Sequence, residues 1–150
     1  METLSPHLPP LILIVDDNKE DQLLIREGFE AGEITKRFHT VSDGAEAMEY
    51  LLRTGRYALP VEAPRPDLIL LDLHMPHVNG RELLAHVKKD EELKNIPIVI
   101  FTTSRQEEDV RFCYAAGANA YVGKPADFDQ LRAILRSIEL CWLEIAPSAP

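Results

Sequence analysis

Short, uninterrupted apolar runs are the most regular feature of the chain. Four of them stand out: Leu11–Val15, Leu68–Leu71, Ile98–Phe101 and the weaker Ala120–Val122. Because apolar residues follow one another instead of alternating with polar ones, these runs predict strands that are buried on both faces. A fifth strand, Phe38–Val41, is expected mainly because predicted helices flank it on both sides.

The segments between these runs have the periodicity of amphipathic helices, with apolar residues three or four positions apart. Such patterns run from Leu23 to Phe29, from Ala47 to Leu52, from Leu83 to Val87 and from Val110 to Tyr114. Alternating strands and helices predict an α/β fold with helices on both faces of a parallel sheet. Ligands of such sheets bind at the carboxyl ends of the strands, so the function is expected there.

Polar residues mark two of the expected helix starts. Asn18 and Ser104 are the expected N-caps, because their side chains can accept a hydrogen bond from the first turn. Ser104 and Glu107 also have the spacing of a capping box.

A longer helix is expected at the carboxyl-terminal end. Its apolar positions are Leu131, Ile134, Leu135, Ile138, Cys141, Trp142 and Ile145. The last turns have no evident core of their own to cover, and exposed apolar surface usually marks an interface. We therefore expect a symmetric homodimer through the side of the fourth and fifth helices, with Trp142, Ile138 and Ile145 in the interface. The alternative is that Trp142 folds back onto its own domain.

Composition narrows the class of protein. The 150 residues can form one domain with a proper core but not two of typical size. A formal net charge of -9 argues against binding to the phosphate backbone of nucleic acid, which needs a basic surface. No apolar run approaches the roughly 20 residues that span a bilayer. We expect a soluble protein that binds neither nucleic acid nor membranes.

The ends of the chain and its cysteines suggest its organisation and compartment. Residues 1–10 hold three prolines and are expected to be a disordered leader, residues 11–145 the folded domain and residues 146–150 a tail. The two cysteines, Cys113 and Cys141, lack a CxxC or metal-ligand spacing. Two free thiols fit a reducing, cytoplasmic compartment.

Functional side chains follow four of the five expected strands. Asp16 and Asp17 come after the first strand, Asp72 after the third, Thr102 after the fourth and Lys124 after the fifth. Carboxylates at one edge repel each other by about 1 kcal/mol per pair in water and by several in a partly buried cleft. Mg²⁺ is the natural compensating cation, because it prefers carboxylate and carbonyl oxygen and bridges to phosphoryl groups. A single acidic residue at a strand end is usually only solvated, but the whole set predicts a site.

Four segments resemble the successive motifs of response-regulator receiver domains. They are Val15-Asp-Asp17, Leu71-Asp-Leu-His-Met-Pro76 with Gly80, Thr102-Thr-Ser104, and Tyr121-Val-Gly-Lys-Pro125. The resemblance extends from about Leu11 to about Ile138. It implies a flavodoxin-like (βα)5 three-layer sandwich with a parallel five-stranded sheet in the order 2-1-3-4-5.

Further features resemble the stand-alone, single-domain response regulators that partner bacterial phytochrome histidine kinases. These features are the long Arg53–Pro66 connection, Arg65-Pro-Asp-Leu-Ile-Leu-Leu-Asp72, Gly80-Arg-Glu-Leu83 and Cys141-Trp-Leu143.

The family resemblance implies a chemical role for the residues at the strand ends. Asp72 would take a phosphoryl group from a phosphohistidine of a sensor histidine kinase. Asp17, Asp72 and the backbone carbonyl of His74 would hold Mg²⁺, with Asp16 acting mainly through water. Lys124 would neutralise phosphoryl charge, aimed inward by a cis-proline at Pro125.

The resemblance also implies a conformational output. Thr102 would hydrogen-bond the new phosphoryl group and vacate space for Tyr121, which changes the face of the fourth helix, fifth strand and fifth helix. His74 and Ser104 lie at positions that tune phosphoryl lifetime in the family. His74 could also titrate near neutral pH beside the phosphoryl group, or simply be a solvated loop residue.

Other functions fit less well. A phosphatase of the aspartyl-phosphate type needs a second Asp two residues after the nucleophile, where this chain has His74, and also a cap domain. The chain has no GxxxxGK[ST] loop, which argues against nucleotide hydrolysis. A pseudo-receiver is disfavoured by the intact acidic set, whereas a phosphorelay intermediate stays open. The expected protein is a switch that catalyses only its own phosphorylation and dephosphorylation.

Overall fold

The computed structural model describes residues 8–75 and 77–143, in which strands and helices alternate along the chain. The strands are β1 (Leu11–Val15), β2 (Arg37–Val41), β3 (Leu68–Leu71), β4 (Ile98–Thr102) and β5 (Ala120–Gly123). The helices are α1 (Lys19–Glu30), α2 (Gly44–Leu52), α3 (Gly80–Lys89), α4 (Glu107–Ala116) and α5 (Phe128–Trp142), with a short 3-10 helix at Gly55–Tyr57. Every expected strand is found within one residue at each end.

The five strands form one parallel sheet in the order β2-β1-β3-β4-β5. This confirms the flavodoxin-like fold expected from the resemblance. β1, β3 and β4 are buried at every position, whereas β2 lies at an edge and is mostly half-buried. An edge strand covers less apolar surface, which explains why the sequence signal of β2 was weak.

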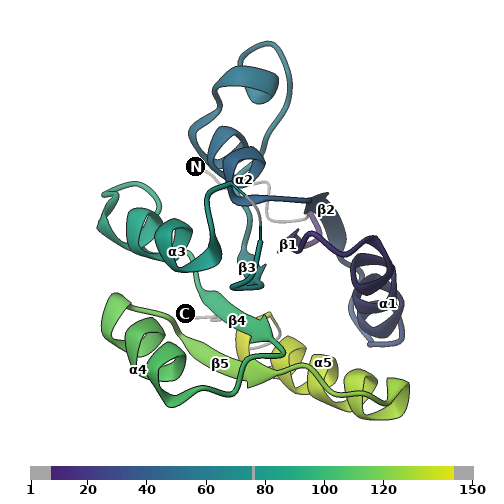
Figure 1. The fold of residues 1–150 in the computed structure, drawn as a ribbon. Coiled ribbons are helices and arrows are strands. Elements are labelled where there is room, and N and C mark those ends of the chain that lie inside the picture. Colours follow the sequence, from purple (N-terminus) through teal and green to yellow (C-terminus); the bar gives the residue numbers. More distant parts are fainter. Residues whose placement is uncertain (1–7, 76, 144–150) are drawn as a thin grey trace, which may run out of the picture.

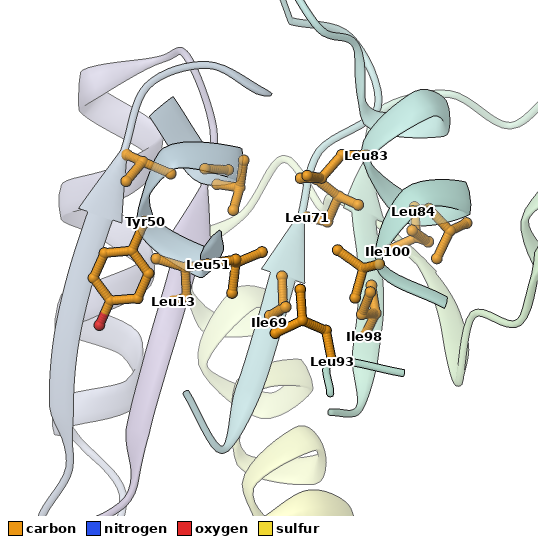
Figure 2. Packing of buried hydrophobic residues seen from close by; sticks show 14 of the residues in the cluster. Leu13, Tyr50, Leu51, Ile69, Leu71, Leu83, Leu84, Leu93, Ile98 and Ile100 are labelled. Atoms are coloured by element: carbon orange, nitrogen blue, oxygen red, sulfur yellow. The ribbon is translucent and has the colours of Figure 1, made fainter. Parts of the chain in front are cut away.

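The sheet is the middle layer of three. Helices α2, α3 and α4 lie on one side of it, and α1 and α5 lie on the other (Figure 1). Alternate residues of each strand point to opposite faces, so both faces need apolar side chains. Leu13, Ile69 and Ile98 pack toward the first group of helices, as Figure 2 shows. Ile12 and Val99 pack toward the second group.

The N-caps of the helices agree with one prediction and contradict another. Asn18 is the N-cap of α1, because its side chain accepts a hydrogen bond from the backbone N–H of Asp21 at 2.9 Å. The N-cap of α4 is Gln106, so the expected cap at Ser104 and its capping box are wrong. The Ser104 hydroxyl instead donates to the Asp109 carboxylate at 2.6 Å. A capping box that the sequence patterns did not predict, formed by Asn79 and Glu82, starts α3.

The position of Ile138 near the end of α5 contradicts its predicted place in a dimer interface. Ile138 is 5% exposed and belongs to the core between α5 and the sheet, so it cannot serve as the expected dimer contact. Trp142 is half-buried and packs against the same core cluster, which is the alternative arrangement considered for it. The third expected interface residue, Ile145, lies outside the described residues.

Most of the expected leader and the tail at 146–150 also lie outside the described residues. Of the leader, residues 8–10 are described, and two of their carbonyls bind β2. The backbone N–H of Arg37 donates to the Pro10 carbonyl at 2.8 Å, and Arg37 Nε donates to the Pro9 carbonyl at 2.9 Å. Across the described helices, length and apolar content fall short of what crossing a bilayer requires.

Candidate functional site

The carboxyl edge of the sheet positions the first acidic residues of the site. Asp72 continues β3, and its backbone N–H donates to the Val15 carbonyl of β1 at 2.9 Å. Asp16 continues β1, and its backbone N–H donates to the Val41 carbonyl of β2 at 3.1 Å. Both side chains are buried, with 2% of Asp16 and 8% of Asp72 exposed. The strand pairing itself therefore holds these two carboxylates at one edge.

Three carboxylates gather there, as the sequence predicts. Asp16, Asp17 and Asp72 each offer one oxygen, and these oxygens all lie within 4.8 Å of one another. Asp17 is exposed, so the group opens to solvent on one side. An all-oxygen donor set with an open side fits a hard divalent cation that keeps part of its water. The role expected for the His74 carbonyl stays a prediction.

Lys124 supplies a positive charge at the other side of these carboxylates. Its Nζ lies 2.7 Å from Asp16 Oδ2, 2.8 Å from Asp21 Oδ2 and 3.2 Å from Asp72 Oδ2. The backbone N–H of Lys124 donates to the Thr102 carbonyl at 2.8 Å, which extends the pairing of β4 with β5. Burial opposes the charged form, but the hydrogen bonds to Asp16 and Asp21 raise the pKa of Lys124 above its usual range.

The expected cis-proline at Pro125 is wrong. Among the described residues the cis peptide bond joins Leu59 to Pro60, and the Lys124–Pro125 bond is not cis. Lys124 points into the site because β5 pairs with β4 up to this residue and because three carboxylates hold its ammonium.

Asp21 is a residue of the site that the sequence analysis missed. It lies in the first turn of α1, four residues after Asp17, and does not directly follow a strand as the expected site residues do. The helical spacing was the available signal, because a residue one turn into α1 stays near the end of β1.

Burial raises the pKa of Asp16 above its ordinary value. Hydrogen bonds from the Lys124 ammonium and from the backbone N–H of Asn18, at 2.9 Å, act in the opposite direction. The site thus combines a desolvated carboxylate with a strongly held ammonium, which is the charge pattern expected of a functional centre.

The two expected switch residues lie on neighbouring strands. Thr102, the last residue of β4, is fully buried, and the backbone N–H of Ser104 approaches its Oγ1 at 3.4 Å. The Tyr121 hydroxyl donates to the Ser104 carbonyl at 2.9 Å. Burial is the main cause that raises the pKa of Tyr121. Tyr121 therefore contacts the loop between β4 and α4 directly.

That loop is also tied to α3 through Asp109, a connection that the sequence analysis missed. The Asp109 carboxylate is buried and accepts from the Ser104 hydroxyl at 2.6 Å and from Arg81 Nη1 at 3.3 Å. The Arg81 guanidinium also lies 4.0 Å from the centre of the Phe112 ring. Arg81 and Asp109 line a cavity that also reaches Asp17 and the exposed side chain of His74.

The chain is similar to known proteins over most of its length. The family model of the response regulator receiver domain matches residues 12–136. Response regulator Rcp1 of Synechocystis sp. is 40% identical over 136 residues, which are 91% of this chain and 90% of Rcp1.

Two solved structures resemble the fold closely. The phosphorylated cyanobacterial phytochrome response regulator RcpA has a TM-score of 0.86 and 44% identity, covering 93% of this chain and 98% of that one. The Mn²⁺-bound form of Rcp1 has a TM-score of 0.85 and 38% identity, covering 95% and 100%. The range matched by the family model includes every residue of the site described above.

Proposed function

The chain belongs to the response regulator receiver domain family, and from this membership we propose that it is a phosphoacceptor switch of a two-component system. Asp72 is the phosphoacceptor and a sensor histidine kinase is the donor. The observation that carries the proposal is the position of the buried Asp72 carboxylate, within reach of Asp16 and Asp17 on one side and 3.2 Å from the Lys124 ammonium on the other.

The arrangement fits phosphoryl transfer to a carboxylate. An oxygen of Asp72 forms a bond to phosphorus, and the bond from phosphorus to the donor imidazole nitrogen breaks, leaving the electron pair on that nitrogen. Lys124 is placed to donate a hydrogen bond to a phosphoryl oxygen. Asp16, Asp17 and Asp72, with the His74 carbonyl, would hold a divalent cation, for which we propose Mg²⁺. That cation supplies charge neutralisation for the phosphoryl oxygens.

The output proposed for the switch follows from the contacts of Thr102 and Tyr121. A phosphoryl group on Asp72 gives the Thr102 hydroxyl a new acceptor, and Tyr121 already contacts the loop that follows Thr102. Movement of this loop would alter the surface of α4, β5 and α5. Ser104 and His74 are the residues proposed to tune phosphoryl lifetime, since both lie two residues beyond a site residue.

We infer a phytochrome-type kinase as the partner and the cytoplasm as the compartment. The similarity to RcpA, a cyanobacterial phytochrome response regulator, supports the partner. The free thiols of Cys113 and Cys141 support a reducing compartment.

Phosphotransfer profiling tests the central proposal. The parent chain and an Asp72→Asn variant are incubated with a panel of phosphorylated histidine kinases, including phytochrome kinases, and the label on each chain is followed. We expect rapid transfer from a phytochrome kinase to the parent and none to the variant. Equal labelling of Asp72→Asn would exclude Asp72 as the acceptor, and transfer only from other kinases would exclude the proposed partner.

We further propose that the protein forms a symmetric homodimer through the side of α4 and α5. Trp142 remains partly exposed beside the core, and Tyr114 of α4 is 51% exposed. Partly exposed aromatic side chains are common anchors of interfaces. Sedimentation analysis of the parent should give a dimer at micromolar concentration, and Trp142→Ala should shift it to the monomer. A monomeric parent would rule the dimer out.

A further inference from the structure

The Lys124 ammonium has three N–H donors and three carboxylate partners, and the partners differ in kind. Asp16 and Asp72 belong to the group of three carboxylates that can hold a divalent cation. Asp21 also binds the ammonium, at 2.8 Å, but does not belong to that group. Of the three partners, Asp21 is therefore the one that a metal ion and a phosphoryl group leave available.

Local structure fixes the position of Asp21. Its backbone N–H donates to the side chain of Asn18 at 2.9 Å, and the backbone N–H of Asn18 donates to Asp16 Oδ1 at 2.9 Å. The first turn of α1 is thus tied to the end of β1 by two hydrogen bonds. The Lys124 side chain is 10% exposed and the Asp21 side chain is 35% exposed, so Asp21 lies on the solvent side of the ammonium.

We propose that Asp21 is a positioning residue for phosphorylation, which acts by holding the Lys124 ammonium in place while the other two carboxylates change partners. This inference rests on the proposed function. The contact of Lys124 with Asp72, at 3.2 Å, is the longest of the three and is the one that a phosphoryl oxygen on Asp72 would replace. The contact with Asp21 does not need to change during the reaction.

Two physical consequences follow. Without Asp21, the long Lys124 side chain regains rotamer freedom, and its ammonium is less often aligned with the incoming phosphoryl group. The phosphorylation rate should therefore fall. Binding of the divalent cation should change little, because Asp21 is not one of the three clustered carboxylates.

The test compares Asp21→Ala with Glu20→Ala in the full chain. Glu20 is the neighbouring acidic residue in the first turn of α1, is exposed and is not one of the ion-pair partners of Lys124. Phosphorylation by acetyl phosphate at saturating Mg²⁺ is followed by intact mass. We expect a roughly fivefold lower rate constant for Asp21→Ala, and a Mg²⁺ concentration for half-maximal rate within about twofold of the parent. Glu20→Ala should match the parent, and Asp21→Glu should recover part of the loss.

A second measurement follows the ammonium itself. Nuclear magnetic resonance of the ¹⁵N-labelled lysine side chains should show a slowly exchanging Lys124 ammonium in the parent and in Glu20→Ala, and faster exchange in Asp21→Ala. This readout does not depend on phosphorylation, so it is informative even if the proposed function fails. An Asp21→Ala rate equal to or above that of the parent, or an unchanged Lys124 signal, would overturn the positioning role. If acetyl phosphate does not phosphorylate the parent at all, that result would instead count against the proposed function.

Discussion

At the scale of single residues, Lys124 contributes one positive charge to a site in which the described part of the chain places four carboxylates. Three of them contact its ammonium directly, and the fourth, that of Asp17, lies beside two of these. The local charge is therefore negative in the absence of a metal ion. A bound cation should therefore stabilise the site, and removal of the Lys124 ammonium should destabilise it.

Replacement of Lys124 by Met should show this balance. Lys124→Met keeps most of the apolar stem but leaves the largely buried carboxylates of Asp16 and Asp72 without their ammonium. We expect the free energy of unfolding to fall by about 2 kcal/mol in the presence of a chelator, and Mg²⁺ to restore part of the loss. Urea unfolding measures both values. Lys19→Met, an exposed change in the same region, should have no such effect, and equal stability of the two variants would contradict the prediction.

The lowered pKa of His39 predicts that the stability of the fold depends on pH through a group that lies outside the proposed phosphoacceptor site. Burial lowers the pKa of His39 below its ordinary value, while nearby Glu46 acts in the opposite direction. The His39 ring stacks on Tyr50, and its Nε2 lies 2.9 Å from the Tyr57 hydroxyl, which donates to Glu46 at 2.8 Å. Since that hydroxyl uses its proton for Glu46, Nε2 of His39 is the donor in their contact.

The sign of the effect follows from the direction of this shift. Below pH 6.5 the unfolded chain binds a proton at His39 more readily than the folded chain does, so protonation favours unfolding. The contribution of His39 to stability should be complete above pH 6.5 and should be lost as the pH falls toward the lower pKa of the folded state. His39→Gln should flatten the rise of unfolding free energy with pH between 5 and 7, measured by urea titration. An identical slope in the variant would assign the effect to other groups.

At the scale of elements, the buried strands were the easiest part to predict from the sequence. β1, β3 and β4 are covered on both faces, so each appears as a continuous apolar run with clear ends. Because the carboxyl ends of parallel strands meet at one edge, the site residues that directly follow strands were predictable too. The N-cap of α4 was misplaced because Gln106 makes no side-chain cap hydrogen bond, whereas Ser104, two residues earlier, has the residue type of a cap but bonds to Asp109 instead.

Contacts between residues far apart in the chain explain which site residues were missed. Arg81 and Asp109 are 28 residues apart in the chain and meet only because α3 and α4 pack side by side. Asp21 meets Lys124 across 103 residues. Local spacing could place Asp21 near the end of β1, but its pairing with Lys124 and the pairing of Arg81 with Asp109 are set by tertiary packing, which a local pattern does not specify.

The connection of α3 to α4 gives a prediction at this scale. Asp109→Ala leaves the Arg81 guanidinium and the Ser104 hydroxyl without their shared acceptor. We expect the free energy of unfolding to fall by about 1 to 3 kcal/mol. Glu108→Ala, at the exposed neighbouring position, should cost less than about 0.5 kcal/mol. A double-mutant cycle of Asp109→Ala with Arg81→Gln should show a coupling energy, and additive losses would show that the two residues act independently.

At the scale of the whole molecule, the side of the sheet at the carboxyl ends of the strands and the side at their amino ends, here called the carboxyl and amino edges, have different roles. The carboxyl edge holds the proposed phosphoacceptor site. The amino edge, at the start of β2, holds a buried ion pair in which Lys36 Nζ lies 2.7 Å from Glu139 Oε1, with 2% and 1% of the two side chains exposed. Glu139 also binds Arg136 at 2.7 Å, and a Cβ at Gly32 would overlap its carboxylate. This cluster joins the connection between α1 and β2 to α5.

Neutralising Glu139 should therefore weaken the fold without affecting the chemistry. Glu139→Gln leaves the buried Lys36 ammonium without its negative partner, and breaking a buried pair in this way costs about 3 to 5 kcal/mol. We expect a loss of that size in urea unfolding, whereas Glu30→Gln, an exposed change on α1, should be close to neutral. The rate of phosphorylation by acetyl phosphate, measured where both proteins are folded, should agree within about twofold, because the pair lies at the edge opposite Asp72. A large loss of rate in folded Glu139→Gln would instead show that α5 transmits changes from one edge of the sheet to the other.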